Sequence, residues 1–252
     1  MKLLAELTWP EARDEQRAGA LVLIPIGATE AHGPHLPLGT DVYLSEELAR
    51  RAARVIEQSG ARVIIAPSIS YSVAEYASEF SGTVSISNSA AVQVLADACV
   101  SLMKQGFEQI CLVNNHLEPA HVESLNAAAA AVEARTGRKI AFPDQTVRRW
   151  ARTLTEEYKR GACHAGQYET SLLLAARPDL VRDSIRAQLA PKPIDLAVAM
   201  KSGIKTFVAA GADQAYFGTP AQATAEEGDA IYHTLVTMVV ETIKETFVIT
   251  SS

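Results

Sequence analysis

Histidine and carboxylate side chains gather in three short polar segments of the sequence. Residues 30–41, 114–121 and 163–171 hold five of the six histidines, and each segment also carries Glu or Asp. Imidazole nitrogen and carboxylate oxygen form the donor set that suits zinc, manganese or iron. Because chance rarely produces this density, the sequence predicts a divalent metal site.

Histidines and carboxylates from all three segments supply the candidate ligands. The candidates are Glu30, His32, Asp41, His116, Glu118 and Glu169. With five or six ligands a pair of ions is expected, because a carboxylate such as Asp41 can bridge ions roughly 3.5 to 4 Å apart. Such a pair lowers the pKa of a water molecule and polarises a carbonyl, which is the chemistry of a hydrolase.

Several residues of these segments also have simpler interpretations. His35 and Asp41 suit loop and helix-cap positions, since Asp is common at caps. His121 suits a cap or an exposed site, and His233 suits the core or surface of a C-terminal helix. Cys163 suits a small buried position, with a thiol nucleophile as the alternative. Caps, loops or core positions do not explain why Glu30, His32, Asp41 and His116 occur together at strand ends.

Apolar segments of strand length alternate with helical periodicity along the chain. Strands are predicted at residues 20–26, 62–66, 109–114, 139–142 and, less regularly, 206–209. Helices are predicted at residues 42–58, 90–105, 122–135, 145–160 and 223–245. Continuous apolar strands fit a sheet that is covered on both faces, and this alternation predicts a parallel α/β sheet. Ligands bind at the carboxyl ends of such strands, where segments 30–41 and 114–121 fall, whereas segment 163–171 is at the start of a helix.

Composition limits the class of protein. Of the 252 residues 48% are hydrophobic and 21% are charged, which supports a folded core and excludes disordered and fibrous classes. The net charge of -6 argues against nucleic acid or an anionic membrane as a partner. The longest apolar run, 20–26, is shorter than the roughly 18 residues of a membrane span, and residues 1–17 lack a signal-peptide pattern. We expect one domain over 1–252, located in the cytoplasm.

One long motif resembles a known family. Residues 25–41, Pro-Ile-Gly-Ala-Thr-Glu-Ala-His-Gly-Pro-His-Leu-Pro-Leu-Gly-Thr-Asp, resemble the signature of the creatininase family of metal-dependent amidohydrolases. Residues 79–85, 114–116, 164–171 and 218–228 are similar to further motifs of that family. The resemblance implies a three-layer α/β/α fold with a mostly parallel sheet. It also implies two divalent ions per chain (Zn, Mn or Fe) and a homohexamer.

The resemblance also implies a role for each candidate ligand. Glu30 and His116 would hold one ion, His32 would hold the other, and Asp41 would bridge them. Glu169 would be either a further ligand or a hydrogen-bonding partner of one.

Catalysis and substrate binding are likewise assigned by resemblance. Glu118 would bind the second ion and help to activate water, and His164 would carry a proton to the leaving nitrogen. Leu117, Tyr71 and Trp150 are the predicted substrate contacts.

The sequence departs from the family pattern around the substrate. Ala74, Glu79 and Ser81 replace residues that are common there, and residues 153–161 lack the tryptophan-bearing flap of creatininases. We therefore expect hydrolysis of a C–N bond in a small amide, cyclic amides included, rather than in creatinine itself.

Two other enzymatic functions and one non-enzymatic function are alternatives to this prediction. The enzyme could remove a formyl group from a formylamino-pyrimidine ribonucleotide, with Arg148, Arg149 and Arg152 as candidate phosphate contacts. It could also cleave a small peptide, as in mycofactocin maturation. A non-catalytic metal-binding α/β protein is the alternative outside enzymes.

Overall fold

Four parallel strands form the central sheet of the computed structural model, which describes residues 1–161 and 163–247. The strands are β1 (Lys2–Leu3), β2 (Leu21–Ile26), β3 (Val63–Ile65) and β4 (Ile110–Asn114). Their order in the sheet is β1-β3-β2-β4. In the register of the sheet, Leu23 of β2 lies opposite Ile65 of β3 and Cys111 of β4. The central position of β2 places its carboxyl end between two neighbouring strands.

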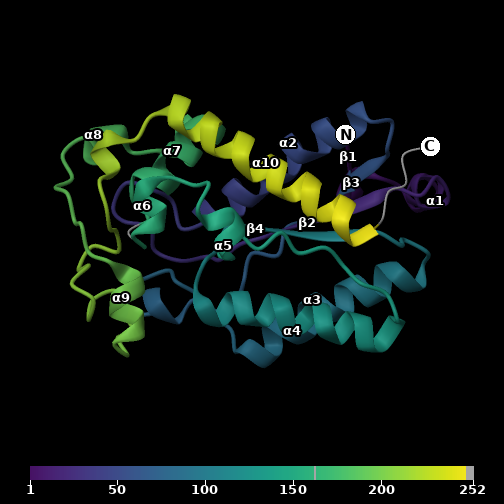
Figure 1. The fold of residues 1–252 in the computed structure, drawn as a ribbon, viewed down its shortest axis with the longest axis horizontal. Helices are drawn as coiled ribbons and strands as arrows, with labels where there is room; N and C mark the ends of the chain where they lie inside the picture. The colour runs from purple at the N-terminus through teal and green to yellow at the C-terminus, as the bar shows by residue number, and fades with distance from the viewer. Residues whose placement is uncertain (162, 248–252) are drawn as a thin grey trace.

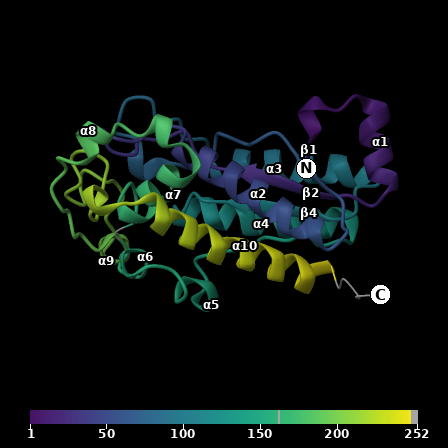
Figure 2. The ribbon, with the colours of Figure 1, turned by 90° about the horizontal axis from the view of Figure 1, so that it is seen from above.

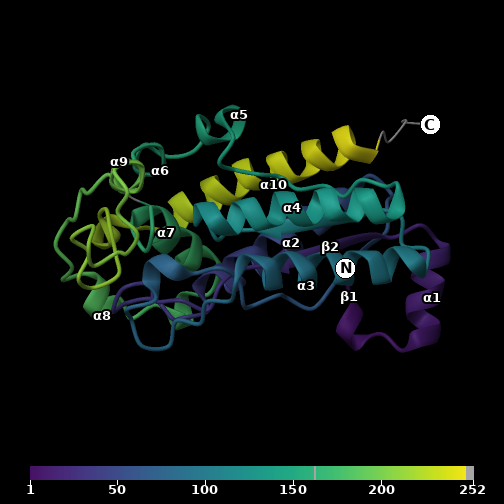
Figure 3. The same ribbon diagram turned by 90° about the horizontal axis from the view of Figure 1, so that it is seen from below.

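Helices cover both faces of this sheet, which confirms the predicted three-layer arrangement (Figures 1 and 3). One face carries α2 (Thr40–Gln58), α7 (Gln167–Ala176) and α10 (Ala225–Phe247), and the other carries α3 (Asn88–Lys104) and α4 (Pro119–Thr136). Alternate residues of β2 serve the two faces: Leu23 packs with the first group and Val22 with the second. All six residues of β2 are buried, as a sheet with two covered faces requires.

The spacing of apolar residues determines which side of a long helix is buried. In α2, the buried residues Leu44, Leu48, Ala52 and Ile56 recur every four positions, so one stripe faces the sheet. Helix α4 begins with a proline, which suits the first helical position, and ends at Gly137 with φ 71°. Both helices begin where a predicted ligand segment ends.

Three predicted elements differ in the structure. Residues 139–142 form a single bridge, between Cys111 and Ala141, instead of a strand, and residues 206–209 form turns. The predicted helix 145–160 is divided into α5 (Arg148–Ala151) and α6 (Glu156–Lys159). It breaks because the Thr155 side chain accepts a hydrogen bond from Tyr158 N and so caps a new helix.

Short helices gather at the end of the molecule opposite the two termini. They include α6, α8 (Asp183–Arg186) and α9 (Leu196–Lys201) (Figures 1 and 2). This is the end towards which β2 and β4 run, so the loops there surround the carboxyl ends of the strands. Within the described residues, none of the helices has the length and apolar character needed to cross a membrane.

A buried carboxylate ties the N-terminal helix to the sheet. Glu15 of α1 (Trp9–Arg17) accepts hydrogen bonds from Lys2 Nζ at 2.6 Å and from Arg62 Nε and Nη2 at 2.9 and 2.7 Å. The Arg62 guanidinium, against the effect of burial and together with the Lys2 ammonium, lowers the pKa of Glu15 from 4.5 to about 2.

We expect Glu15→Gln to lower the free energy of unfolding by about 1 to 3 kcal/mol near pH 7. Because the folded pKa is depressed, this stabilisation is complete above pH 4.5 and is lost as the pH falls towards 2. Urea unfolding of both proteins at several pH values measures the difference, with Glu123→Gln at an exposed position of α4 as the control. A difference that does not shrink in acid would contradict the assignment.

Candidate metal centre

The carboxyl ends of β2 and β4 and the beginning of α2 meet at one point. Glu30 and His32 follow β2, His116 follows β4, and Asp41 lies in the first turn of α2. Gly27 allows the strand end to approach α2 this closely, because a Cβ atom at position 27 would lie 2.8 Å from Asp41 Cβ and 2.5 Å from the backbone nitrogen of Val42. The backbone of the strand end therefore rests directly on the turn that carries Asp41.

Asp41 lies between two imidazoles. Its Oδ2 is 3.1 Å from His116 Nδ1, and its Oδ1 is 3.1 Å from His32 Nε2. Glu30 Oε1 lies 3.2 Å from His116 Nδ1, and Glu169 Oε2 lies 3.6 Å from His32 Nε2. Two groups of three potential ligands therefore share Asp41: one with Glu30 and His116, and one with His32 and Glu169.

Three imidazoles of the centre are oriented by main-chain carbonyl groups. The pairs are His32 Nδ1 with Glu30 O at 3.1 Å, His116 Nε2 with Val73 O at 2.8 Å, and His164 Nε2 with Ala31 O at 3.0 Å. Because a carbonyl oxygen only accepts, each of these ring nitrogens must carry the proton. In the neutral ring the other nitrogen then offers its lone pair to the cluster, as in metal-ligating histidines.

The electrostatics of the centre favour a cation. Although burial opposes it, the surrounding carboxylates, led by Asp41, raise the pKa of His32 to about 10. Against burial as well, the imidazoles of His32 and His116 hold the pKa of Asp41 below its usual range. Glu30 Oε2 and Asp41 Oδ2 are buried without a hydrogen-bond partner in the described residues. A divalent cation would satisfy these oxygens, so the residues fit a metal.

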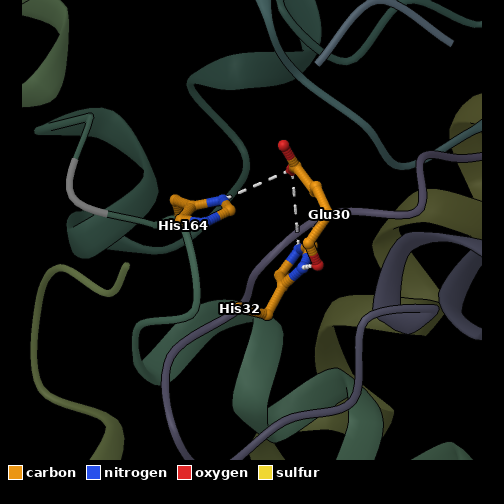
Figure 4. Close-up of side chains that lie close together, drawn as sticks. All are labelled: Glu30, His32 and His164. Atoms are coloured by element: carbon orange, nitrogen blue, oxygen red, sulfur yellow. Dashed lines mark hydrogen bonds and ion pairs between the residues drawn. The ribbon is translucent and has the colours of Figure 1, made fainter. Parts of the chain in front are cut away.

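Burial acts differently on two further groups of the cluster. It raises the pKa of Glu169 to about 8, and, together with the nearby His32, it lowers the pKa of His164 to about 4. His164 is therefore a neutral imidazole, and Figure 4 shows it and His32 turned towards the Glu30 carboxylate. The distance from His164 Nδ1 to Glu30 Oε1 is 3.7 Å.

The backbone between His164 and Glu169 is strained. Ala165 has φ 47°, a left-handed conformation that is unfavourable for a residue with a side chain. Its N–H donates to Glu169 Oε2 at 2.6 Å. This bond fixes the carboxylate that faces His32 and leaves the preceding His164 directed into the centre.

A cavity of about 230 Å³ opens beside the cluster. Glu30, His116, His164 and Glu169 form its polar wall, and the apolar wall includes Tyr76, Leu117, Leu196, Met200 and Phe207. The Phe207 ring packs on the His164 ring with centroids 4.2 Å apart. Among the described lining residues there is no Lys or Arg. The cavity therefore suits an uncharged, apolar group next to the cluster.

The remaining predicted residues are Glu118, Tyr71 and Trp150. The Glu118 carboxylate lines the cavity but accepts hydrogen bonds from the N–H groups of Glu75 and Tyr76, at 3.2 and 3.1 Å. Tyr71 is 55% exposed, and Trp150 packs under the Arg149 guanidinium; both lie outside the described cavity lining. The roles of these three residues stay predictions.

Some residues of this region differ from their expected surroundings. His121, expected at a cap or exposed, is completely buried, so that expectation is wrong. His35 is also buried and its Nε2 bonds Thr170 Oγ1 at 2.9 Å. Cys163 lines the cavity, but burial raises the pKa of its thiol well above the usual range, which argues against a thiolate nucleophile.

Comparisons with known proteins found similar sequences and a similar fold. A family model described as Creatininase, creatinine amidohydrolase, matches residues 5–243. The mycofactocin precursor peptide peptidase of Mycolicibacterium smegmatis is 35% identical over 230 residues, 89% of this chain and 84% of that protein. The creatinine amidohydrolase of Pseudomonas putida is 30% identical over 196 residues, 71% of this chain and 73% of that protein. A solved structure described as "Creatininase Mn" has the same fold, with a TM-score of 0.71, 24% identity and coverage of 97% of this chain and 98% of that chain.

Proposed function

Because the chain belongs to the creatininase family, we propose that this hydrolase of C–N bonds cleaves an amide bond in a small peptide, with two divalent ions per chain. The observation that carries the substrate class is the cavity, whose polar wall is the candidate metal centre and whose other wall is apolar. The similarity to a mycofactocin precursor peptide peptidase supports a peptide.

Two sets of residues would hold the ions. Glu30, Asp41 and His116 would hold one, and His32, Asp41 and Glu169 would hold the other. When bound, zinc or manganese polarises the carbonyl of an amide and lowers the pKa of a water molecule. Imidazole and carboxylate ligands suit both metals.

His164 is suited to move the proton. Its Nε2 is committed to Ala31 O, so only Nδ1, which faces the Glu30 carboxylate, can take up or release a proton. A neutral imidazole there accepts a proton from the attacking water and returns it to the leaving nitrogen. The Phe207 ring covers one face of this imidazole and limits its access to bulk water.

The cavity wall favours some substrates over others. A ribonucleotide phosphate would need a cation, and the described lining residues offer none, so a deformylase is the weaker candidate. A small cyclic amide is the second candidate, because the creatinine amidohydrolase of Pseudomonas putida is also similar to this chain. The homohexamer and the cytoplasmic location that we expected remain proposals, which sizing chromatography and cell fractionation test.

The proposed function can be tested with a substrate panel. The protein is stripped with a chelator, reloaded with Zn or Mn, and offered short peptides with apolar, acidic or basic residues, a cyclic amide, and a formylamino-pyrimidine nucleotide. We expect metal-dependent cleavage of apolar peptides above the other substrates. If the protein preferred the cyclic amide or the nucleotide, that compound would replace the peptide as the proposed substrate. If it bound metal but hydrolysed none of these compounds, it would be a non-catalytic metal-binding protein.

A charge placed in the apolar wall should weaken substrate binding. We expect Met200→Lys to lower kcat/KM for an apolar peptide by roughly tenfold, mainly through KM, because an ammonium in the apolar wall disfavours an apolar side chain of the peptide. The control is Val198→Lys on the same helix, where the side chain is 56% exposed and outside the described lining. Equal kinetics for both variants would contradict this placement of the substrate.

A further inference from the structure

The side chain of Asn114 holds the main chain of His116 from both sides. Its Nδ2 donates to His116 O at 2.7 Å, and its Oδ1 accepts from His116 N–H at 3.1 Å. Both residues are buried, with 4% and 3% of their surface exposed. The bond from His116 Nε2 to Val73 O then fixes the ring itself. Together these three hydrogen bonds leave one direction for Nδ1, towards Glu30 and Asp41.

His121 completes this arrangement from the first turn of α4. Its Nε2 lies 2.9 Å from Asn114 Oδ1, and its ring packs against the His116 ring with centroids 4.8 Å apart. An amide oxygen only accepts hydrogen bonds, so Nε2 of His121 carries the proton. The side chain is fully buried, so water cannot replace this donor.

The bond from His121 decides which end of the Asn114 amide faces His116 N–H. An asparagine amide has an oxygen and an NH₂ group of nearly the same shape, and hydrogen bonds alone choose between them. If the amide turned over, its NH₂ would face the N–H groups of both histidines, and the bond to His116 O would also be lost. His121 Nε2–H is therefore a second donor to Asn114 Oδ1, after His116 N–H, and only the observed orientation of the Asn114 amide accepts both hydrogen bonds.

We propose that His121, acting through Asn114, is a positioning residue that fixes His116 Nδ1 for metal binding. Its hydrogen bond goes to Asn114 and not to a donor atom of the metal ligands, so it acts on the direction of His116 Nδ1 indirectly. The inference rests on the proposed function only in that the cluster binds metal. It predicts that His121 affects the ion held by His116 more than the ion held by His32.

Metal titration of the chelator-stripped protein tests this role without measuring activity. We expect His121→Phe, which keeps a flat ring but has no N–H, to weaken one of the two binding steps for Zn or Mn by about 10- to 100-fold. His121→Gln retains a donor and should recover most of that affinity. With Co²⁺ in the site, the absorption spectrum of His121→Phe should change, because the spectrum reports the ligand geometry.

A matched variant separates positioning from general loosening of the helix. Leu125→Ala removes an equally buried side chain from the same helix but leaves the hydrogen bonds of Asn114 in place. Weakening of metal binding in Leu125→Ala as large as that in His121→Phe would overturn the proposal, and so would unchanged affinity and spectrum in His121→Phe. Should His121→Phe fail to fold, Asn114→Asp, which removes the Nδ2 donor, is expected to show the same loss. Wild type that binds no metal would contradict the metal centre itself, which distinguishes that failure from failure of this proposal.

Discussion

Asp41→Asn is expected to remove most of the bound metal and to lower kcat/KM by roughly 1,000-fold. Metal ions contribute several kcal/mol to catalysis, and about 1.4 kcal/mol corresponds to a factor of ten. Each oxygen of Asp41 faces a different imidazole, at 3.1 Å in both cases. Asparagine has the same shape but one oxygen and no charge. One group of ligands therefore loses its oxygen from residue 41, and the other keeps an oxygen that is no longer charged. Elemental analysis and kinetics on the same preparation measure the two effects.

The stability of the Asp41→Asn protein provides the control for folding. In the chelator-stripped protein the variant loses one partner of the buried pairs with His32 and His116, so its thermal midpoint should fall, and metal content and kinetics are compared below both midpoints. Asp97→Asn, at a position that is half exposed, should change neither metal content nor activity. Wild-type metal content in Asp41→Asn would show that the two groups of ligands do not share this carboxylate.

His164→Gln should lower kcat by roughly 100- to 10,000-fold, the usual contribution of a general acid or base. Glutamine can still donate to Ala31 O, but it cannot exchange a proton near neutral pH. We expect the variant to keep its metal and to bind substrate with little change in KM. Elemental analysis, kcat and the pH dependence of kcat together test the assignment.

The metal content of His164→Gln distinguishes two roles. Glu30, His32 and His164 also lie close enough together to hold an ion. Loss of an ion together with activity would assign His164 to that third group of ligands, whereas loss of activity alone would assign it to proton transfer. His233→Gln, exposed on α10, should behave as wild type.

Much of the framework was predictable because its signals are local. The run of apolar residues from Leu21 to Ile26 has the length and composition of a buried strand, and α2 has a four-residue repeat. Residue types in the loops after these elements indicated the metal chemistry. The parallel topology then brings Glu30, Asp41 and His116 to the same edge of the sheet.

Other features depend on distant contacts that no local pattern contains. The apolar run at 206–209 resembles a strand, but Phe207 instead packs on the rings of His164 and Tyr76. His121 resembled an exposed helix residue, yet it is fully buried and its Nε2 bonds the side chain of Asn114, seven positions earlier. The two consecutive asparagines at the end of the predicted strand, Asn114 and Asn115, were the available sign that this loop needs internal hydrogen bonds.

The close approach at Gly27 has a consequence for the choice of metal. Because backbone rather than a side chain of the strand end touches the turn that carries Asp41, a side chain at position 27 would displace this turn. Glu169, by contrast, lies on a separate segment and is held by a hydrogen bond from the Ala165 N–H. Attempts to retune the enzyme for a larger or smaller ion should therefore keep Gly27 and vary the residues around 163–169.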